Sequence, residues 1–267
     1  MAGVPSLLAK TLRDERRGLI GWGVGLAALV VLMLAYYPTV RHSPELNKFA
    51  RELPEGVKAL IGGAEEYTSP AGYLNGELFA FMLPLLFLVY GIGLGSRAIA
   101  GEEERRTIDL LLANPISRTR VVLEKAAAGA VGVLVLGVIV AAALLLGGPA
   151  AGMKIGAEKL LAAVISVALL GLMFGSLALM LSSATGTRRS TRGIAAALGV
   201  AAYFLNALAP LASTLRPYRK LSPFYWYAGN EPLRHGLSVA HVALLLALTL
   251  VLLAAAVALF NRRDIAV

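Results

Sequence analysis

The chain has 267 residues, of which 58% are hydrophobic and only 15% are charged, and it contains no cysteine. Soluble domains carry more charge, and the lack of cysteine excludes disulfides, thiolate metal sites and a cysteine nucleophile. Because the apolar residues form blocks of about 20, the length that crosses a bilayer, we predict an integral membrane protein, and we attribute the net charge of +9 to topology and anionic lipid rather than to nucleic acid.

The N-terminal residues 6–17 are basic and amphipathic, with leucines on one side and the cations Lys10, Arg13 and Arg17 elsewhere. This pattern predicts a helix that lies in the headgroup region. A first span is expected at 18–37, ended by Pro38. No short apolar core followed by a small-residue cleavage site precedes it, so we expect no cleavable signal peptide.

An outer loop is predicted at 38–74. Within it, apolar residues recur at spacings of three and four, which predicts a second surface-lying amphipathic helix, interrupted at Pro54. The second span is expected at 75–97, with a kink at Pro84. Glu77, near the outer surface, is the acid closest to a span, and we interpret it as a solvated interfacial carboxylate.

The segment 98–125 is the densest block of charge in the chain. Three acids, Glu102, Glu103 and Glu104, suit the positive end of a helix, and we expect that helix to run through Leu112 until Asn114-Pro115 stops it. Ser117 is a candidate cap for the next helix. The segment therefore predicts helix, turn and helix on a membrane surface, although an ordinary solvated cytoplasmic loop has a similar composition.

Four further spans are expected at 126–146, 160–181, 194–213 and 239–260, with a second outer loop at 214–238. Six spans place both termini on one side, and the segments on that side hold more Lys and Arg than the opposite ones. The positive-inside rule makes that side cytoplasmic. We thus predict an all-α membrane protein with six transmembrane helices, cytoplasmic termini and one transmembrane domain over residues 1–267.

The sequence contains no motif that indicates catalysis or nucleotide binding by this chain. No Gly-Lys dipeptide occurs, so a P-loop is excluded, and neither a GxSxG elbow nor an HExxH helix is present. Glycines at 91, 93 and 95, at 21 and 25, and at 171 and 175 are interpreted as helix-packing positions, because small residues let helices approach closely in lipid. We expect no cofactor and no metal in this chain.

The sequence AIAGEEERRTIDLLLANPISRTRVVLEK closely resembles the segment between spans two and three in ATP-binding-cassette permeases of the second export type. The family pattern falls on Gly101-Glu102, Thr107, Leu110 to Leu112, Pro115 and Ser117-Arg118. The stretches 68–79, 222–237 and 260–265 are also similar to the family, so the resemblance covers essentially the whole chain. Arg106 departs from the pattern, since relatives often have Gly before the Thr.

The resemblance implies a coupling helix at Glu102 to Leu112 that sits in a groove of a separate P-loop ATPase subunit. The residues expected to contact that subunit are Gly101, Glu102, Glu103, Arg105, Thr107, Ile108, Leu111, Leu112, Pro115 and Arg118. The basic helix before span one, with Lys10, Arg13 and Arg17, would form a second contact.

The resemblance further implies two ATPase subunits, which bind ATP and Mg, and a second copy of this chain or a relative. Spans two and five would line the pathway, which nominates Phe81, Phe87, Tyr203 and Asn206. The expected function is the membrane subunit of an ATP-driven exporter in a prokaryotic inner membrane, with an amphipathic or hydrophobic substrate. A membrane-embedded assembly or immunity factor that binds a partner is the alternative, and an intramembrane enzyme is disfavoured by the missing motifs.

Overall fold

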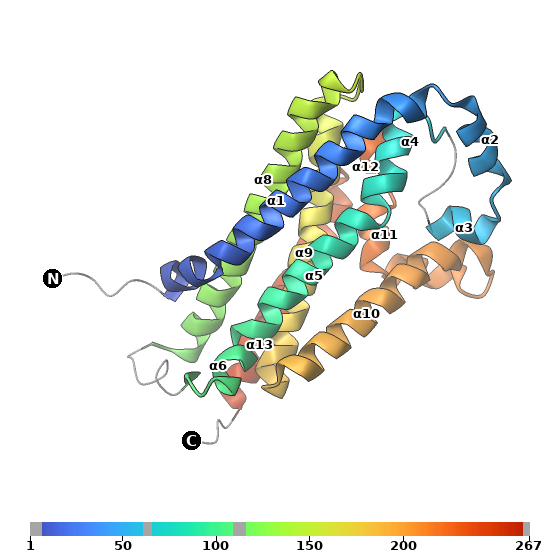
Figure 1. The fold of residues 1–267 in the computed structure, drawn as a ribbon. Helices are drawn as coiled ribbons and strands as arrows, with labels where there is room; N and C mark the ends of the chain where they lie inside the picture. Colours follow the sequence, from blue (N-terminus) through green and yellow to red (C-terminus); the bar gives the residue numbers. More distant parts are fainter. Residues whose placement is uncertain (1–6, 61–65, 109–115, 264–267) are drawn as a thin grey trace.

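The computed structural model describes residues 7–60, 66–108 and 116–263, and within them all regular structure is helical. Six long helices form the bundle shown in Figure 1. They are α1 (Leu7–Arg41), α5 (Met82–Ala98), α8 (Arg118–Ala150), α9 (Ala157–Thr185), α10 (Arg188–Leu208) and α13 (Val239–Arg262). Each, with α5 counted from Pro70 and α10 to Leu211, is long and apolar enough to cross a membrane. The predicted class, an all-α membrane protein with six spans, is confirmed.

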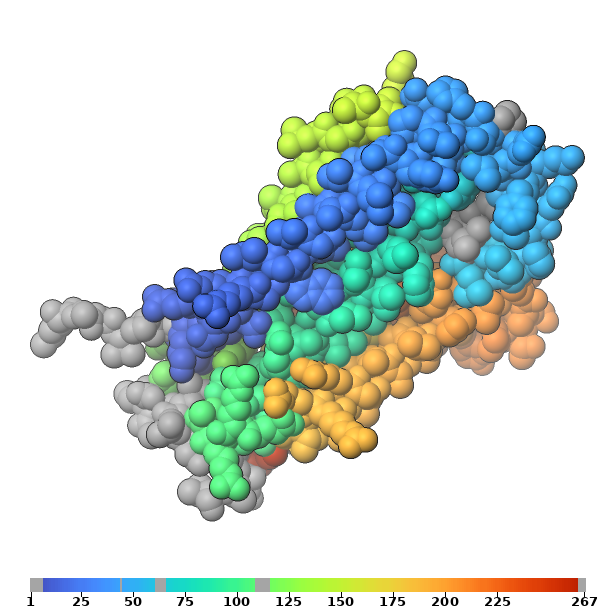
Figure 2. All heavy atoms as spheres, in the orientation of Figure 1, coloured from blue at the N-terminus to red at the C-terminus, as the bar shows by residue number. Residues whose placement is uncertain are grey.

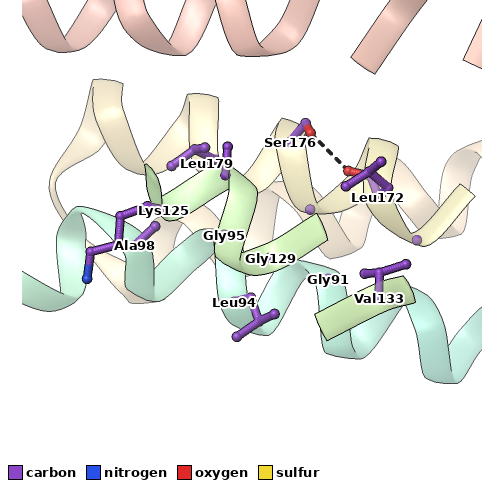
Figure 3. Close-up of a pocket in the computed structure, with 13 residues that line it drawn as sticks. Gly91, Leu94, Gly95, Ala98, Lys125, Gly129, Val133, Leu172, Ser176 and Leu179 are labelled. Carbon is purple, nitrogen blue, oxygen red and sulfur yellow. Dashed lines mark hydrogen bonds between the residues drawn. The ribbon is translucent and has the colours of Figure 1, made fainter. Parts of the chain in front are cut away.

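Helix α9 is the centre of the bundle, because it packs against α5, α8, α10 and α13, while α1 packs against α8. The α5–α9 contact is made backbone to backbone: a Cβ atom on Gly91 would strike the carbonyl oxygen of Gly171, and one on Gly95 would strike that of Gly175. Figure 3 shows this small-residue seam. The packing interpretation is confirmed for these glycines.

Three other glycines do not pack as predicted. A Cβ added at Gly21, Gly25 or Gly93 would meet nothing within 4 Å, so these positions face away from the rest of the chain. Gly93 lies on the side of α5 opposite the seam, since residues two apart on a helix do not share a face.

The first helix differs from the prediction, because α1 is one continuous helix through Pro38. From Leu7, where the described chain begins, the residues expected to form a separate interfacial helix are the first turns of α1. Pro38 removes a single backbone hydrogen bond near the helix end, and the buried side chains of Tyr37 and Val40 hold the chain against the core on either side of it. Tertiary packing of this kind outweighs local propensity.

Helices α2 (Pro44–Glu52) and α3 (Glu55–Leu60) are separated at Leu53-Pro54, as predicted. The second span begins with α4 (Pro70–Leu74) and a π-helical turn, η1 (Asn75–Phe79). Helix α5 starts after an irregular turn at Ala80-Phe81. The irregularity therefore lies one turn before Pro84, because a proline ring clashes with the carbonyl group four residues earlier.

The predicted outer loop 214–238 is largely structured. After η2 (Ala209–Leu211), the chain forms η3 (Arg216–Leu221), α11 (Pro223–Ala228) and α12 (Pro232–His235). Helices α11 and α12 fold back onto α9. Phe224 and Tyr227 are buried, and the Tyr227 hydroxyl donates to the carbonyl oxygen of Phe79 at 2.6 Å. The aromatic run is thus part of the core at the end of the bundle that also holds α2, α3 and α4.

Candidate functional site

The short helix α6 (Ala100–Glu104) follows α5 at the end of the bundle where α1 begins and α13 ends (Figure 1). Ala100 and Gly101 are buried, and the Ala100 amide donates to the Ser182 hydroxyl of α9 at 2.9 Å. This hydrogen bond fixes the start of α6 against the central helix α9. It orients the glutamates that follow toward the neighbouring helices.

The glutamate triple, Glu102 to Glu104, connects α6 to three other spans. Glu102 accepts from Lys125 of α8 at 2.7 Å. Glu103 accepts two hydrogen bonds from Arg263, just after α13, at 2.8 and 2.7 Å. Glu104 accepts from the backbone amide of Arg188, the first residue of α10, at 2.8 Å and pairs with its guanidinium. Three consecutive carboxylates therefore hold α8, α10 and the end of α13.

Hydrogen bonds lower the pKa of two of these carboxyl groups, those of Glu102 and Glu104. Burial alone would raise the pKa of Glu102, but hydrogen bonds from Lys125 and from the Thr107 hydroxyl, at 2.6 Å, outweigh it and lower that pKa. The backbone and side-chain hydrogen bonds of Arg188 lower the pKa of Glu104. The ion pairs thus persist at neutral pH.

A single helix from Glu102 to Leu112 was expected, and this prediction is wrong, because α6 ends at Glu104. Arg106 has φ of +54°, in the left-handed region that favours glycine, and the chain turns there to bring Thr107 back to Glu102. The family's Gly at this position therefore has a conformational reason. Leu111, Leu112 and Pro115 lie outside the described residues.

The burial of Ile108 argues against its predicted contact with a partner subunit. Its side chain is only 4% exposed and packs in a cluster with Ile99, Val121 and Phe260 of this same chain. The apolar contact that was expected with a partner is made within this chain for Ile108. Residues of α5, α8 and α13 form it. Arg105 and Arg106, in contrast, are exposed.

Ser117 caps α8 as predicted, accepting from the Arg120 amide at 3.3 Å. Arg118 also acts within the chain. Its guanidinium donates to the carbonyl oxygens of Phe260 and Arg263, at 3.1 and 2.6 Å, and lies over the Phe260 ring. These bonds satisfy carbonyl groups at the C-terminal end of α13, which its own helix leaves unpaired.

The N-terminal cations Lys10, Arg13 and Arg17 are exposed on the first turns of α1. The same turns are fixed to the bundle from their other side, where the Leu8 amide donates to Glu124 at 2.8 Å and Glu15 pairs with Arg97 at 3.0 Å. The start of α1 is therefore fixed to α8 and α5, and its cations remain exposed.

Four residues were nominated for the pathway. The prediction is wrong for Phe87, because this side chain is fully buried against Gly171 in the α5–α9 contact. Tyr203 and Asn206 line a cavity of about 930 Å³ at the opposite end of the bundle from α6. Phe81 is 45% exposed, and its ring packs edge-on against Tyr203 at 5.8 Å.

The sequence reasoning missed Lys125, Arg188 and Arg263 as partners of the glutamate triple. The available signal was charge complementarity, since the loop at 182–193 holds arginines without an acid. In the part of the chain that the structure describes, no three His, Asp or Glu side chains gather as metal ligands do.

A family model described as ABC-2 family transporter protein matches residues 6–265, nearly the whole chain. No curated protein matches the chain.

Proposed function

The chain belongs to the ABC-2 transporter family, and on this premise we propose that it is the permease subunit of an ATP-driven exporter. The six spans make the chain a multi-pass membrane protein. Its membership in a family of membrane components of transporters gives it a role in transport. The chain has no P-loop of its own. In this proposal two separate ATPase subunits bind ATP and Mg, and the complex lies in a prokaryotic inner membrane with both termini of this chain in the cytoplasm.

The observation that carries the proposal is the linkage of α6 to three spans at once. A force applied to α6 reaches α8 through Glu102, the end of α13 through Glu103, and α10 through Glu104. A coupling helix needs such connections, because closure of the ATPase subunits moves the spans only through groups that are held together.

The surface offered to the ATPase is basic. Arg105 and Arg106 are exposed beside α6, and neither forms an ion pair with another described residue. Lys10, Arg13 and Arg17 are also exposed, on the first turns of α1, which begins at the same end of the bundle. We therefore expect an ATPase groove lined by acids, with the glutamate triple serving inside the permease rather than at the contact.

A second permease copy would cover the face where α5 lies between α1 and α10, shown in Figure 2. Phe81, just before α5, and Leu85 and Val89 of α5 are exposed apolar side chains. The pathway would run between the two copies along this face, with α5 and α10 on its walls.

Co-purification from the native membrane tests the proposal. The tagged wild type should retain a P-loop ATPase of about 200 to 350 residues, a chain of one or two domains. The variant Arg105→Glu/Arg106→Glu should lose it, whereas Arg216→Glu/Lys220→Glu, with the same charge change on exposed residues at the other end, should keep it.

Detergent-solubilised samples must first show equal elution volumes and thermal midpoints, so that loss of the ATPase reflects the contact. If correctly folded wild type brings no P-loop ATPase, the exporter proposal fails. A membrane-embedded assembly or immunity factor would then be the better explanation for any other protein that co-purifies.

A further inference from the structure

The cavity of about 930 Å³ opens to the surface and is lined by α3, the end of α10, η3 and α11, together with residues of α4, η1 and α12. Its volume falls in the range of small-molecule sites, roughly 300 to 1,000 Å³. The walls hold four cations and three carboxylates. All seven lie outside the six candidate membrane spans.

Each of the three carboxylates lies near a cation, although two of them share Arg234. Glu55 pairs with Lys58 at 2.7 Å, and Glu231 and Glu66 lie 3.5 and 3.9 Å from Arg234. Two cations in the wall, Arg51 and Arg219, form no ion pair with any residue that the structure describes. The excess positive charge in the cavity favours an anionic ligand.

Arg219 is held in place without being neutralised. Its Nε donates to the Asn206 side-chain oxygen at 3.2 Å, and its guanidinium lies over the Tyr225 ring, 5.3 Å from the centroid. A stacked, oriented guanidinium keeps its remaining donors for bidentate binding of a carboxylate or phosphate. Among the described residues, the terminal nitrogens of Arg219 have no hydrogen-bond partner.

An aromatic surface lies beside this cation. Tyr203, which lines the cavity, contacts the rings of Phe224, Phe204 and Phe81 at centroid distances of 5.4 to 5.8 Å. The Tyr203 hydroxyl donates to the Leu60 carbonyl at 2.7 Å, so its ring is fixed against α3. Cation and aromatic wall together suit a molecule with a charged head and an apolar body.

We propose that this cavity binds the anionic headgroup of an amphipathic molecule, with Arg219 as the group that contacts the anion. The inference deepens the proposed function, on which it rests, because it assigns the exported substrate to the class of anionic amphiphiles. The apolar part of the ligand would lie along Tyr203 toward Phe81, which is exposed just before α5.

The test uses the full-length permease in nanodiscs of zwitterionic lipid, without ATPase. The probe is 11-(dansylamino)undecanoate, and its neutral methyl ester is the matched control ligand. Energy transfer from Trp226 reports binding, since Trp226 lies in α11 between Phe224 and Tyr227, which line the cavity. The chain has two tryptophans, so Trp22→Phe makes Trp226 the sole donor.

We expect saturable binding of the carboxylate probe that dodecanoate displaces and butyrate does not, with the ester bound at least tenfold more weakly. Arg219→Gln should weaken the carboxylate probe about tenfold or more, because it removes a charge-assisted contact. Asn206→Asp, which places a carboxylate against Arg219 without removing packing, should do the same. Arg219→Lys should bind more tightly than Arg219→Gln but more weakly than the wild type, because lysine keeps the charge and lacks the bidentate geometry of the guanidinium. Lys220→Gln, an exposed neighbour outside the cavity, should change the affinity less than twofold.

Equal affinity for acid and ester, or equal losses from Arg219→Gln and Lys220→Gln, would overturn the proposal. Displacement by butyrate as effective as by dodecanoate would overturn its amphipathic part, because the site would then hold any free carboxylate. The two proposals fail separately. Charge-selective binding without a co-purifying ATPase contradicts the exporter, whereas a retained ATPase with charge-independent binding contradicts only the anion site.

Discussion

Replacing Glu102 by Gln should destabilise the permease by about 2 kcal/mol. The Lys125 side chain is only 10% exposed and Glu102 is 24% exposed, so the substitution leaves a largely buried ammonium without its carboxylate. Removing one partner of a fully buried pair costs about 3 to 5 kcal/mol, and an exposed pair contributes about 0 to 1 kcal/mol. The partial burial of this pair places the expected cost between these limits.

Thermal unfolding in detergent measures this cost, with Glu104→Gln as the matched control. Glu104 and Arg188 are both more exposed than the Glu102 pair, so the control should shift the midpoint less. In a double-mutant cycle, Lys125→Gln should recover part of the loss, because the double variant leaves no buried charge unpaired. Equal shifts for Glu102→Gln and Glu104→Gln, or strictly additive effects in the cycle, would refute the reasoning.

The same pair has a defined pH dependence. Burial raises the pKa of Glu102, but hydrogen bonds from Lys125 and Thr107 bring it below the ordinary value of 4.5. A carboxyl group with a lowered folded-state pKa stabilises the protein above its unfolded pKa and loses that contribution as the pH falls through the folded-state value. The stability gap between wild type and Glu102→Gln should therefore be constant from about pH 8 to 5.5 and narrow below about 4.5.

Four further substitutions have expected outcomes that the same unfolding assay checks. Gly91→Ala should destabilise by about 2 kcal/mol, since its methyl group meets the Gly171 backbone, whereas Gly93→Ala, with open space around it, should be neutral or stabilising by up to about 1 kcal/mol. Arg106→Gly should stabilise by about 1 kcal/mol by relieving a left-handed backbone, and a loss of stability there would show that the turn is not strained. Arg118→Gln should cost about 1 to 2 kcal/mol through lost charged hydrogen bonds at the end of α13, and an unchanged midpoint would contradict that capping role.

The features that the sequence predicts correctly depend on local interactions. Apolar runs of sufficient length fix the six spans, Ser117 caps the helix that follows it, and Pro54 separates α2 from α3. Each of these depends on residues within one or two turns. Pro38 misled the prediction because the burial of residues beside it, a tertiary effect, holds α1 together through the proline.

The candidate site was harder to predict because its partners are distant in sequence. Glu103 and Arg263 are 160 residues apart, and Arg118 and Phe260 are 142 apart. Glu102 and Glu103 were assigned to the ATPase because their segment resembles the one between spans two and three in ATP-binding-cassette permeases of the second export type. In the folded chain both carboxylates are used internally, and Arg105 and Arg106 are the charges left exposed.

Helix α10 joins the two sites discussed above. It begins at Arg188, bound to Glu104 of α6, and its last turns carry Tyr203 and Asn206 in the cavity wall. A helix of 21 residues spans about 30 Å, so one rigid element connects the coupling end to the proposed anion site. Its buried residues, Thr191, Ala195, Gly199 and Ala207, are all small.

A small-residue contact of this kind gives α10 fewer interlocking side chains than large residues would, so a shift along its axis costs less repacking. A displacement of α6 would be transmitted along α10 to Asn206, because Glu104 binds the first residue of α10. Asn206 in turn holds Arg219 through its side-chain oxygen. In the proposed exporter, this connection would let ATP-driven movement at one end change how an anion is held at the other.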